Sequence, residues 1–115
     1  MLHTNIITRT DLLNKIKFGA VTVVFRKDVF VPEMKSIRRV TLAHLHMPEN
    51  AIADLMYVHS KEKHPANILK VWEMVSQSFI DIDLYNVVEA IYEDEFGRPH
   101  YVYIDGDLEG TVEVG

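Results

Sequence analysis

The stretch 68-ILKVWEMVSQSFIDIDLYNVVEAIYE-93 decides the fold class of this chain. It contains three apolar runs, at residues 68–75, 78–85 and 86–93. Each run is rich in Ile, Val and aromatic residues that nearly alternate with polar ones, which is typical of β-strands. The gaps between the runs are too short for the crossover helices of a parallel sheet, so an antiparallel sheet is predicted.

Three more strands are predicted outside this stretch. Residues 20–27 and about 34–45 alternate between apolar and polar side chains, and residues 100–104, HYVYI, follow the turn signal FGRP. Pro32 cannot donate a hydrogen bond to a central strand ladder, so residues 28–33 are expected to form a loop or an edge bend. Six short strands with short links favour a small antiparallel sheet that curls and closes, as in SH3/Sm-like barrels.

Two helices are predicted beside the strands. In residues 8–19, Thr8 and Asp11 have the spacing of a capping box, apolar residues follow at helical intervals, and a glycine ends the segment. Residues 49–58 have an apolar pattern that fits a second short helix. Residues 60–67 are polar, charged and interrupted by a proline, which indicates a loop.

The composition is typical of one folded domain, residues 1–115, with an acidic C-terminal tail. Hydrophobic residues make up 48% of the chain and charged residues 25%, as in ordinary folded proteins. The absence of cysteine excludes disulfides and thiolate chemistry. No apolar run approaches the roughly 20 residues that span a bilayer, and the N-terminus lacks the pattern of a secretory signal. We therefore expect a cytoplasmic protein.

The charges are divided unevenly along the chain. Residues 1–72 contain 11 Lys and Arg against 6 Asp and Glu, whereas residues 73–115 contain only Arg98 against 11 acidic residues. Such an asymmetry points to partners of opposite charge. The alternative is that the two halves neutralise each other across one barrel.

The first two predicted strands carry several cations, which would attract a phosphate backbone. The candidate nucleic-acid-binding residues are Arg26, Lys27, Lys35, Arg38 and Arg39. Alternation places Arg38 and Arg39 on opposite sides of their strand, with Arg38 at the rim of the barrel and Arg39 outside. The alternative is an exposed edge whose charges only protect it from aggregation.

The acidic half suggests a protein partner. Carboxylates spaced along a surface can imitate DNA phosphates and occupy the basic cleft of a host enzyme. The candidate protein-binding residues are Asp81, Asp83, Glu93, Asp94 and Glu95.

Four aromatic side chains in the same half could act as platforms for nucleic-acid bases. They are Tyr92, Phe96, Tyr101 and Tyr103. Acidic residues surround them in the sequence and would repel phosphate, so core packing or a protein contact is the favoured role.

Neither a metal site nor a catalytic site is predicted. His44 and His46 would share one face of a strand, but no third ligand has a defined spacing. Asp81 and Asp83 would also share a strand face, which an exposed strand explains without chemistry. The chain lacks a Gly-rich phosphate loop, a nucleophile elbow and an HExxH pattern, so we expect neither enzyme activity nor a cofactor.

Three segments, LLNKIKFGAVTVVFRKD, IRRVTLAHLHMP and residues 68–93, resemble a small phage-encoded family described as WYL-like with an Sm-like SH3 β-barrel fold. The matching positions are Phe25, Lys27, Asp28, Arg38, Thr41, Leu42, Pro48, Val71, Trp72, Glu73 and Phe79. Two features depart from the family: the turn after Asp28 is longer, and Asp81 and Asp83 stand where a basic residue is expected near Phe79. The resemblance implies a bacteriophage accessory protein of Sm/SH3-like fold.

These observations favour a non-enzymatic phage accessory or regulatory protein that binds nucleic acid, or the nucleic-acid machinery, through its basic hairpin. Two alternatives stay open, namely an acidic inhibitor that binds a host factor and a small-ligand sensor. The sensor would need a polar pocket near Arg38 and His44.

Overall fold

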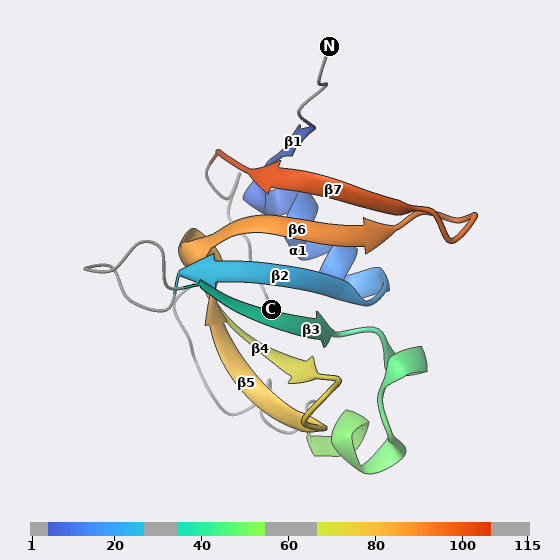
Figure 1. The fold of residues 1–115 in the computed structure, drawn as a ribbon. Helices are drawn as coiled ribbons and strands as arrows, with labels where there is room; N and C mark the ends of the chain where they lie inside the picture. The colour runs from blue at the N-terminus through green and yellow to red at the C-terminus, as the bar shows by residue number, and fades with distance from the viewer. Residues whose placement is uncertain (1–4, 27–34, 55–66, 107–115) are drawn as a thin grey trace.

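The computed structural model describes residues 5–26, 35–54 and 67–106, in which seven strands form one mixed sheet (Figure 1). The strand order is β1-β7-β6-β2-β3-β4-β5. The strands are β1 (Ile6–Ile7), β2 (Val21–Arg26), β3 (Lys35–Thr41), β4 (Ile68–Glu73), β5 (Ser78–Asp83), β6 (Val87–Glu93) and β7 (Pro99–Ile104). The predicted mainly-β class is confirmed, and each of the six predicted strands is present.

Neighbouring strands are antiparallel except for β1, which runs parallel to β7. β6 does not pair with β5, which precedes it, because the short turn η2 (Leu84–Asn86) redirects the chain and β6 pairs with β2 instead. The Asp83 carboxylate accepts a hydrogen bond from the Tyr85 N–H at 3.0 Å and fixes this turn. β1 and β5 are the two ends of the strand order, and within the described residues they do not pair with each other. The sheet is therefore not closed by hydrogen bonds.

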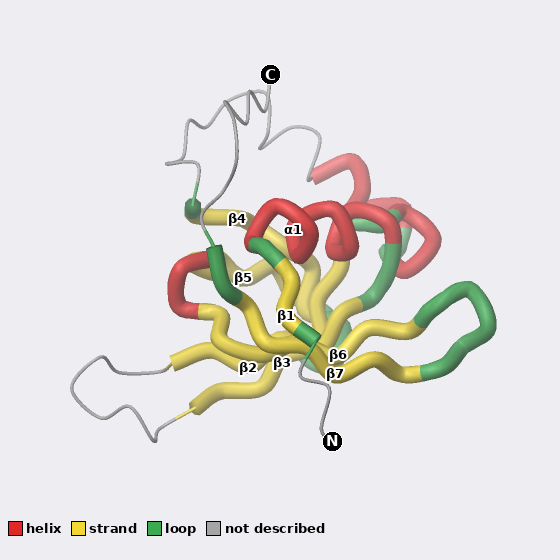
Figure 2. Tube along the Cα trace, turned by 90° about the horizontal axis from the view of Figure 1, so that it is seen from above, coloured by secondary structure: helices red, strands yellow, loops and turns green. Residues whose placement is uncertain are grey.

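Helix α1 (Arg9–Phe18) packs against one face of the sheet and lies above it in Figure 2. Thr8 Oγ1 accepts a hydrogen bond from the Asp11 N–H at 3.1 Å, which confirms the predicted N-terminal cap. The buried apolar side chains of the helix are Leu12, Leu13 and Ile16. Their burial against the sheet, rather than helix propensity alone, holds a helix of this length in place.

The main core lies between α1 and the sheet and contains mostly β-branched side chains. Its buried strand residues include Val21, Val23, Val40, Val71, Val87, Ala90 and Val102. A smaller cluster forms on the other side of β4, where the rings of Trp72 and Phe79 meet edge to face, 5.1 Å apart, beside Ala51. Residues 49–54 are helical, in agreement with the first part of the predicted second helix, and residues 55–58 lie outside the described residues.

β3 ends earlier than the strand predicted over residues 34–45. The Thr41 hydroxyl accepts a hydrogen bond from the Ala43 N–H at 2.9 Å, so this backbone group is not available to extend the strand ladder. The chain then turns into the 3-10 helix η1 (His44–His46). The prediction that these two histidines share one face of a strand is therefore wrong.

Several predicted features fall outside the described residues: Lys27, the loop at 28–33, residues 60–66 and the acidic tail after residue 106. β1 was not predicted, because two residues are too few to show an alternating pattern. In the part of the chain that the structure describes, no helix has the length and apolar character needed to cross a membrane.

Candidate functional site

We call the side of the sheet opposite α1 the outer face; it is turned toward the viewer in Figure 1. Strand register brings residues that are far apart in the sequence together on this face. One row across β3, β2, β6 and β7 consists of Arg39, Thr22, Ile91 and Tyr101. The next row consists of Ile37, Val24, Glu89, Tyr103 and Ile6. The cation-bearing strand β3 and the tyrosine-bearing strand β7 thus share one surface.

Three of the five candidate cations lie on the outer face. Arg26 and Lys35 are direct partners across β2 and β3, and Lys35 Nζ lies 3.7 Å from Glu89 Oε1. Arg39 donates a hydrogen bond from Nη1 to Thr22 Oγ1 at 3.5 Å. The β2–β3 side of the outer face is therefore positively charged.

Arg38 lies on the other side of β3, opposite Val23. Burial raises the pKa of Glu73, but hydrogen bonds from Ser76 and the nearby charge of Arg38 outweigh it, and the pKa lies below its usual value. Arg38 therefore contributes to the charge environment of Glu73 and does not join the three cations of the outer face. The fifth candidate, Lys27, is outside the described residues.

Tyr101 and Tyr103 expose 47% and 43% of their surface on the outer face. Their rings meet edge to face with centroids 5.5 Å apart. A hydrogen bond to Glu89, together with partial desolvation and the Glu89 charge, raises the pKa of Tyr101 to about 12. The Glu89 carboxylate therefore interacts with both Lys35 and Tyr101, which offsets its repulsion of an anionic ligand.

The aromatic residues were predicted to serve in core packing or a protein contact, and exposure excludes core packing for these two tyrosines. The alternation in HYVYI contained the signal: Val102 and Ile104 are buried, so Tyr101 and Tyr103 must point the other way. The sequence did not show that they share a face with Arg39, because that depends on the pairing of β6 with β2. Phe96 is also exposed, in the turn between β6 and β7.

The five acidic candidates form two separate groups rather than one surface. Asp81 and Asp83 are on β5, at one end of the sheet, whereas the other three lie at the β6–β7 turn. Asp83 accepts hydrogen bonds from the Asn67 side chain and from the Tyr85 N–H, so it has a structural role. Because the carboxylates are divided, they do not form one continuous acidic surface that could imitate the phosphates of a DNA backbone.

The Asp94 carboxylate is hydrogen-bonded to residues of its own β6–β7 hairpin. Its Oδ1 accepts the Phe96 and Arg98 N–H groups at 2.9 Å, and its Oδ2 lies 2.9 Å from His100 Nε2. The His100 hydrogen bond, followed by those from the Arg98 and Phe96 N–H groups, lowers the pKa of Asp94 to about 2. Asp94 therefore stays ionised under ordinary conditions and organises the turn.

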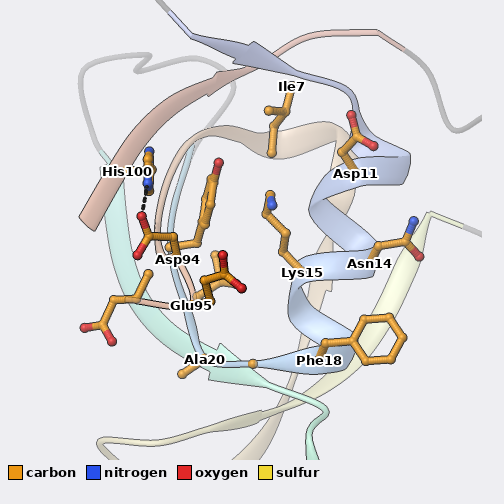
Figure 3. A pocket seen from close by; sticks show the side chains of 13 residues that line it. Ile7, Asp11, Asn14, Lys15, Phe18, Ala20, Asp94, Glu95 and His100 are labelled. Atoms are coloured by element: carbon orange, nitrogen blue, oxygen red, sulfur yellow. Dashed lines mark hydrogen bonds and ion pairs between the residues drawn. The ribbon is translucent and has the colours of Figure 1, made fainter. Parts of the chain in front are cut away.

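A cleft of about 700 Å³ lies between α1 and the end of the β6–β7 hairpin (Figure 3). Lys15 reaches into it from α1, and its ammonium lies 3.8 Å from the centroid of the Tyr92 ring. The His100 ring stacks on Tyr92 with centroids 5.2 Å apart. Arg38 and His44, near which the small-ligand sensor alternative would need a polar pocket, do not line this cleft.

Among the described residues, no group of three or more His, Cys, Asp or Glu is placed to hold a metal ion. His44 and His46 are exposed on η1. Comparison with protein-family models, curated proteins and solved structures finds no match to this chain. Functional inference therefore depends on the residues and geometry described above.

Proposed function

We propose that this chain is a non-enzymatic accessory or regulatory protein of a bacteriophage that binds single-stranded nucleic acid on its outer face. One observation carries the proposal: Arg39 and Tyr101 lie in the same cross-strand row, with Lys35 and Arg26 beside them. Cations attract the phosphate backbone, and exposed aromatic rings stack on bases. The face combines both elements.

The dimensions of the face fit a short strand of nucleic acid. Arg39 on β3 and Tyr101 on β7 are separated by three strand spacings, or about 14 Å. A stacked strand rises about 3.4 Å per nucleotide, so roughly four nucleotides would cross the sheet. Phosphates would contact β2 and β3 while bases reach the tyrosines on β7.

The two tyrosines favour a single strand over a duplex. Bases inside a duplex are stacked on one another and do not offer a free π-face to a side chain. Stacking on an aromatic side chain is worth about 1–3 kcal/mol per base. A duplex would use the cations alone and bind more weakly.

The fold proposed for this function is an open form of the SH3/Sm-like barrel. Support comes from the order β5-β4-β3-β2-β6, the helix α1 that precedes β2, and the turn η2 that precedes β6. The phage origin and the regulatory role rest on the resemblance to WYL-like proteins. The pairing of β7 and β1 beyond β6 extends this arrangement.

Fluorescence anisotropy with labelled single-stranded and duplex oligonucleotides at two salt concentrations tests the proposal. We expect single strands to bind more tightly and both complexes to weaken as salt rises. Arg39→Gln should weaken binding, and Tyr101→Ala with Tyr103→Ala should remove the preference for single strands. Lys17→Gln, an exposed cation of α1, and Tyr85→Ala, a tyrosine of similar exposure on η2, serve as controls. Absence of binding at low salt would discard the proposal.

A further inference from the structure

β5 is an edge strand of the sheet. It forms one end of the strand order, and its six residues pair with β4 in unbroken register (Figure 1). Bulges, prolines and lysines often protect a sheet edge from added strands, and β5 contains none of them. Its only charged side chains are Asp81 and Asp83. An edge of this kind can accept an extended segment as a further strand and selects it by charge.

The pairing of β4 with β5 shows which backbone groups of β5 face outward. The Leu84 N–H donates a hydrogen bond to the Asn67 carbonyl at 2.8 Å, so this pair and every second pair along the ladder are hydrogen-bonded. The alternate residues Phe79 and Asp81 therefore direct their N–H and C=O groups away from β4. Among the described residues, no backbone group bonds these two residues from the outer side. Four backbone groups can thus bond a partner strand.

The side chains of β5 set different requirements on its two faces. Ile80 and Ile82 face the main core, and Ile80 is only half-buried. Asp81 is exposed on the other face, where Lys70 of β4 is its direct partner, and it forms no ion pair with a described residue. An apolar residue beside Ile80 would extend the core. A cationic residue beside Asp81 would continue the alternation of charge that starts at Lys70.

The same side chains disfavour β5 of a second copy as the occupant. In the two antiparallel registers that centre two β5 strands on each other with like faces together, Asp81 lies opposite its own counterpart or opposite Phe79 of the second copy. Like charges directly opposite destabilise a strand pair, and an aromatic ring leaves the carboxylate without a cation. A strand with basic residues avoids both.

We propose that the β5 edge binds an extended segment of a partner protein in which basic and apolar residues alternate. The segment would run antiparallel to β5 and bond the outward groups of Phe79 and Asp81. Its basic side chains would lie beside Asp81 and Asp83, and its apolar side chains beside Ile80 and Ile82. In such complexes backbone hydrogen bonds supply affinity and alternate side chains supply specificity.

This inference goes beyond the proposed function and is independent of it. The nucleic-acid site spans β3, β2, β6 and β7, whereas β5 lies beyond β4 at one end of the strand order. A basic segment on β5 would use none of the cations or tyrosines of that site. Either proposal can therefore fail while the other holds.

Nuclear magnetic resonance titration of the full chain with the capped peptide Lys-Val-Lys-Val-Tyr at low salt tests the inference. Antiparallel alignment places its lysines opposite Asp83 and Asp81 and its valines opposite Ile82 and Ile80. We expect saturable shifts in β5 and severalfold slower exchange of the Phe79 and Asp81 amides. The control peptide Lys-Lys-Val-Val-Tyr has the same composition without the alternation. Equal binding of both peptides would show nonspecific charge attraction and overturn the inference.

Backbone methylation of the peptide tests whether it adds as a strand. Methylation at the N–H of the second lysine removes the donor to Asp81 and should weaken binding about tenfold. Methylation at the N–H of the second valine, which would point away from β5, should change binding by less than about twofold. Slow exchange of the Phe79 and Asp81 amides in the free protein would show that the edge is already covered and would contradict the inference.

Three substitutions at Asp81 separate the role of its charge from that of its N–H. Asp81→Asn keeps the N–H and should weaken binding up to about fivefold. Asp81→Pro removes an N–H that β4 does not use, so the fold should persist while binding weakens about tenfold. Asp81→Lys should favour the peptide Lys-Val-Glu-Val-Tyr over the original, and no such reversal would count against the assigned register. Glu95→Gln, an exposed carboxylate at the β6–β7 turn, is the control and should leave binding unchanged.

Discussion

The outer face and the cleft have opposite balances of charge. On the outer face the carboxylate of Glu89 lies beside cations, whereas in the cleft the ammonium of Lys15 lies among carboxylates. In both places a tyrosine contacts the charge that is in the minority, Tyr101 for Glu89 and Tyr92 for Lys15. The comparison shows how one small sheet can present two surfaces with opposite balances of charge.

This inversion follows from the topology rather than from the division of charge along the sequence. β6 belongs to the acidic part of the chain and pairs with β2 from the basic part. Glu89 is thereby placed beside Lys35, while Tyr92, on the other side of β6, lines the cleft. The two halves of the sequence are therefore interleaved and do not form two separate regions.

The largest effect is expected from the packing of α1, which supports the cleft but not the outer face. Ile16 is fully buried, so Ile16→Ala should lower the free energy of unfolding by about 2–5 kcal/mol. Amide hydrogen exchange should rise more in α1 than in β2 and β6, if the helix can open without the sheet. Urea unfolding and hydrogen exchange measure the two effects.

Phe18→Ala on the same helix is the control for this prediction. Phe18 is exposed, so its removal should change stability by no more than about 0.5 kcal/mol. If Ile16→Ala and Phe18→Ala lower the free energy of unfolding equally, the assignment of one face of α1 to the core and the other to the cleft is wrong. The contrast between cleft and outer face would then lose its basis.

A smaller effect is expected from Asp94, which borders the cleft. Its folded pKa, about 2, is below the ordinary value of 3.8, because the hydrogen bond from His100 favours the carboxylate. The stabilisation is therefore fully present above about pH 4 and is lost as the pH falls through 2. In urea unfolding, Asp94→Asn should reduce the change of the free energy of unfolding with pH in this window. Asp81→Asn should leave that change unaltered. An unchanged slope would mean that the turn does not depend on the Asp94 charge.

The sequence predicted the local elements well because their signals lie within a few residues. Thr8 and Asp11 marked the start of α1, and alternation located all six longer strands. The two surfaces could not be predicted, because they depend on which strands become neighbours. The contact of Lys15 with Tyr92 depends on the pairing of β6 with β2, which follows the turn η2. The same pairing places Arg39 and Tyr101 in one cross-strand row. No local pattern encodes that return.

The smallest effect concerns Glu89 on the outer face. Glu89 raises the folded pKa of Tyr101 to about 12 from 10.0, so its stabilisation is complete below pH 10 and is lost as the pH rises toward 12. Glu89→Ala should return the ionisation of Tyr101 toward pH 10, seen as tyrosinate absorbance that Tyr101→Phe lacks. The same variant should also tighten oligonucleotide binding slightly, because it removes a negative charge that lies between the cations and the tyrosines. An unshifted titration would mean that Tyr101 does not hydrogen-bond to Glu89, so that the Glu89 charge would repel phosphate and the outer face would be a weaker match for nucleic acid.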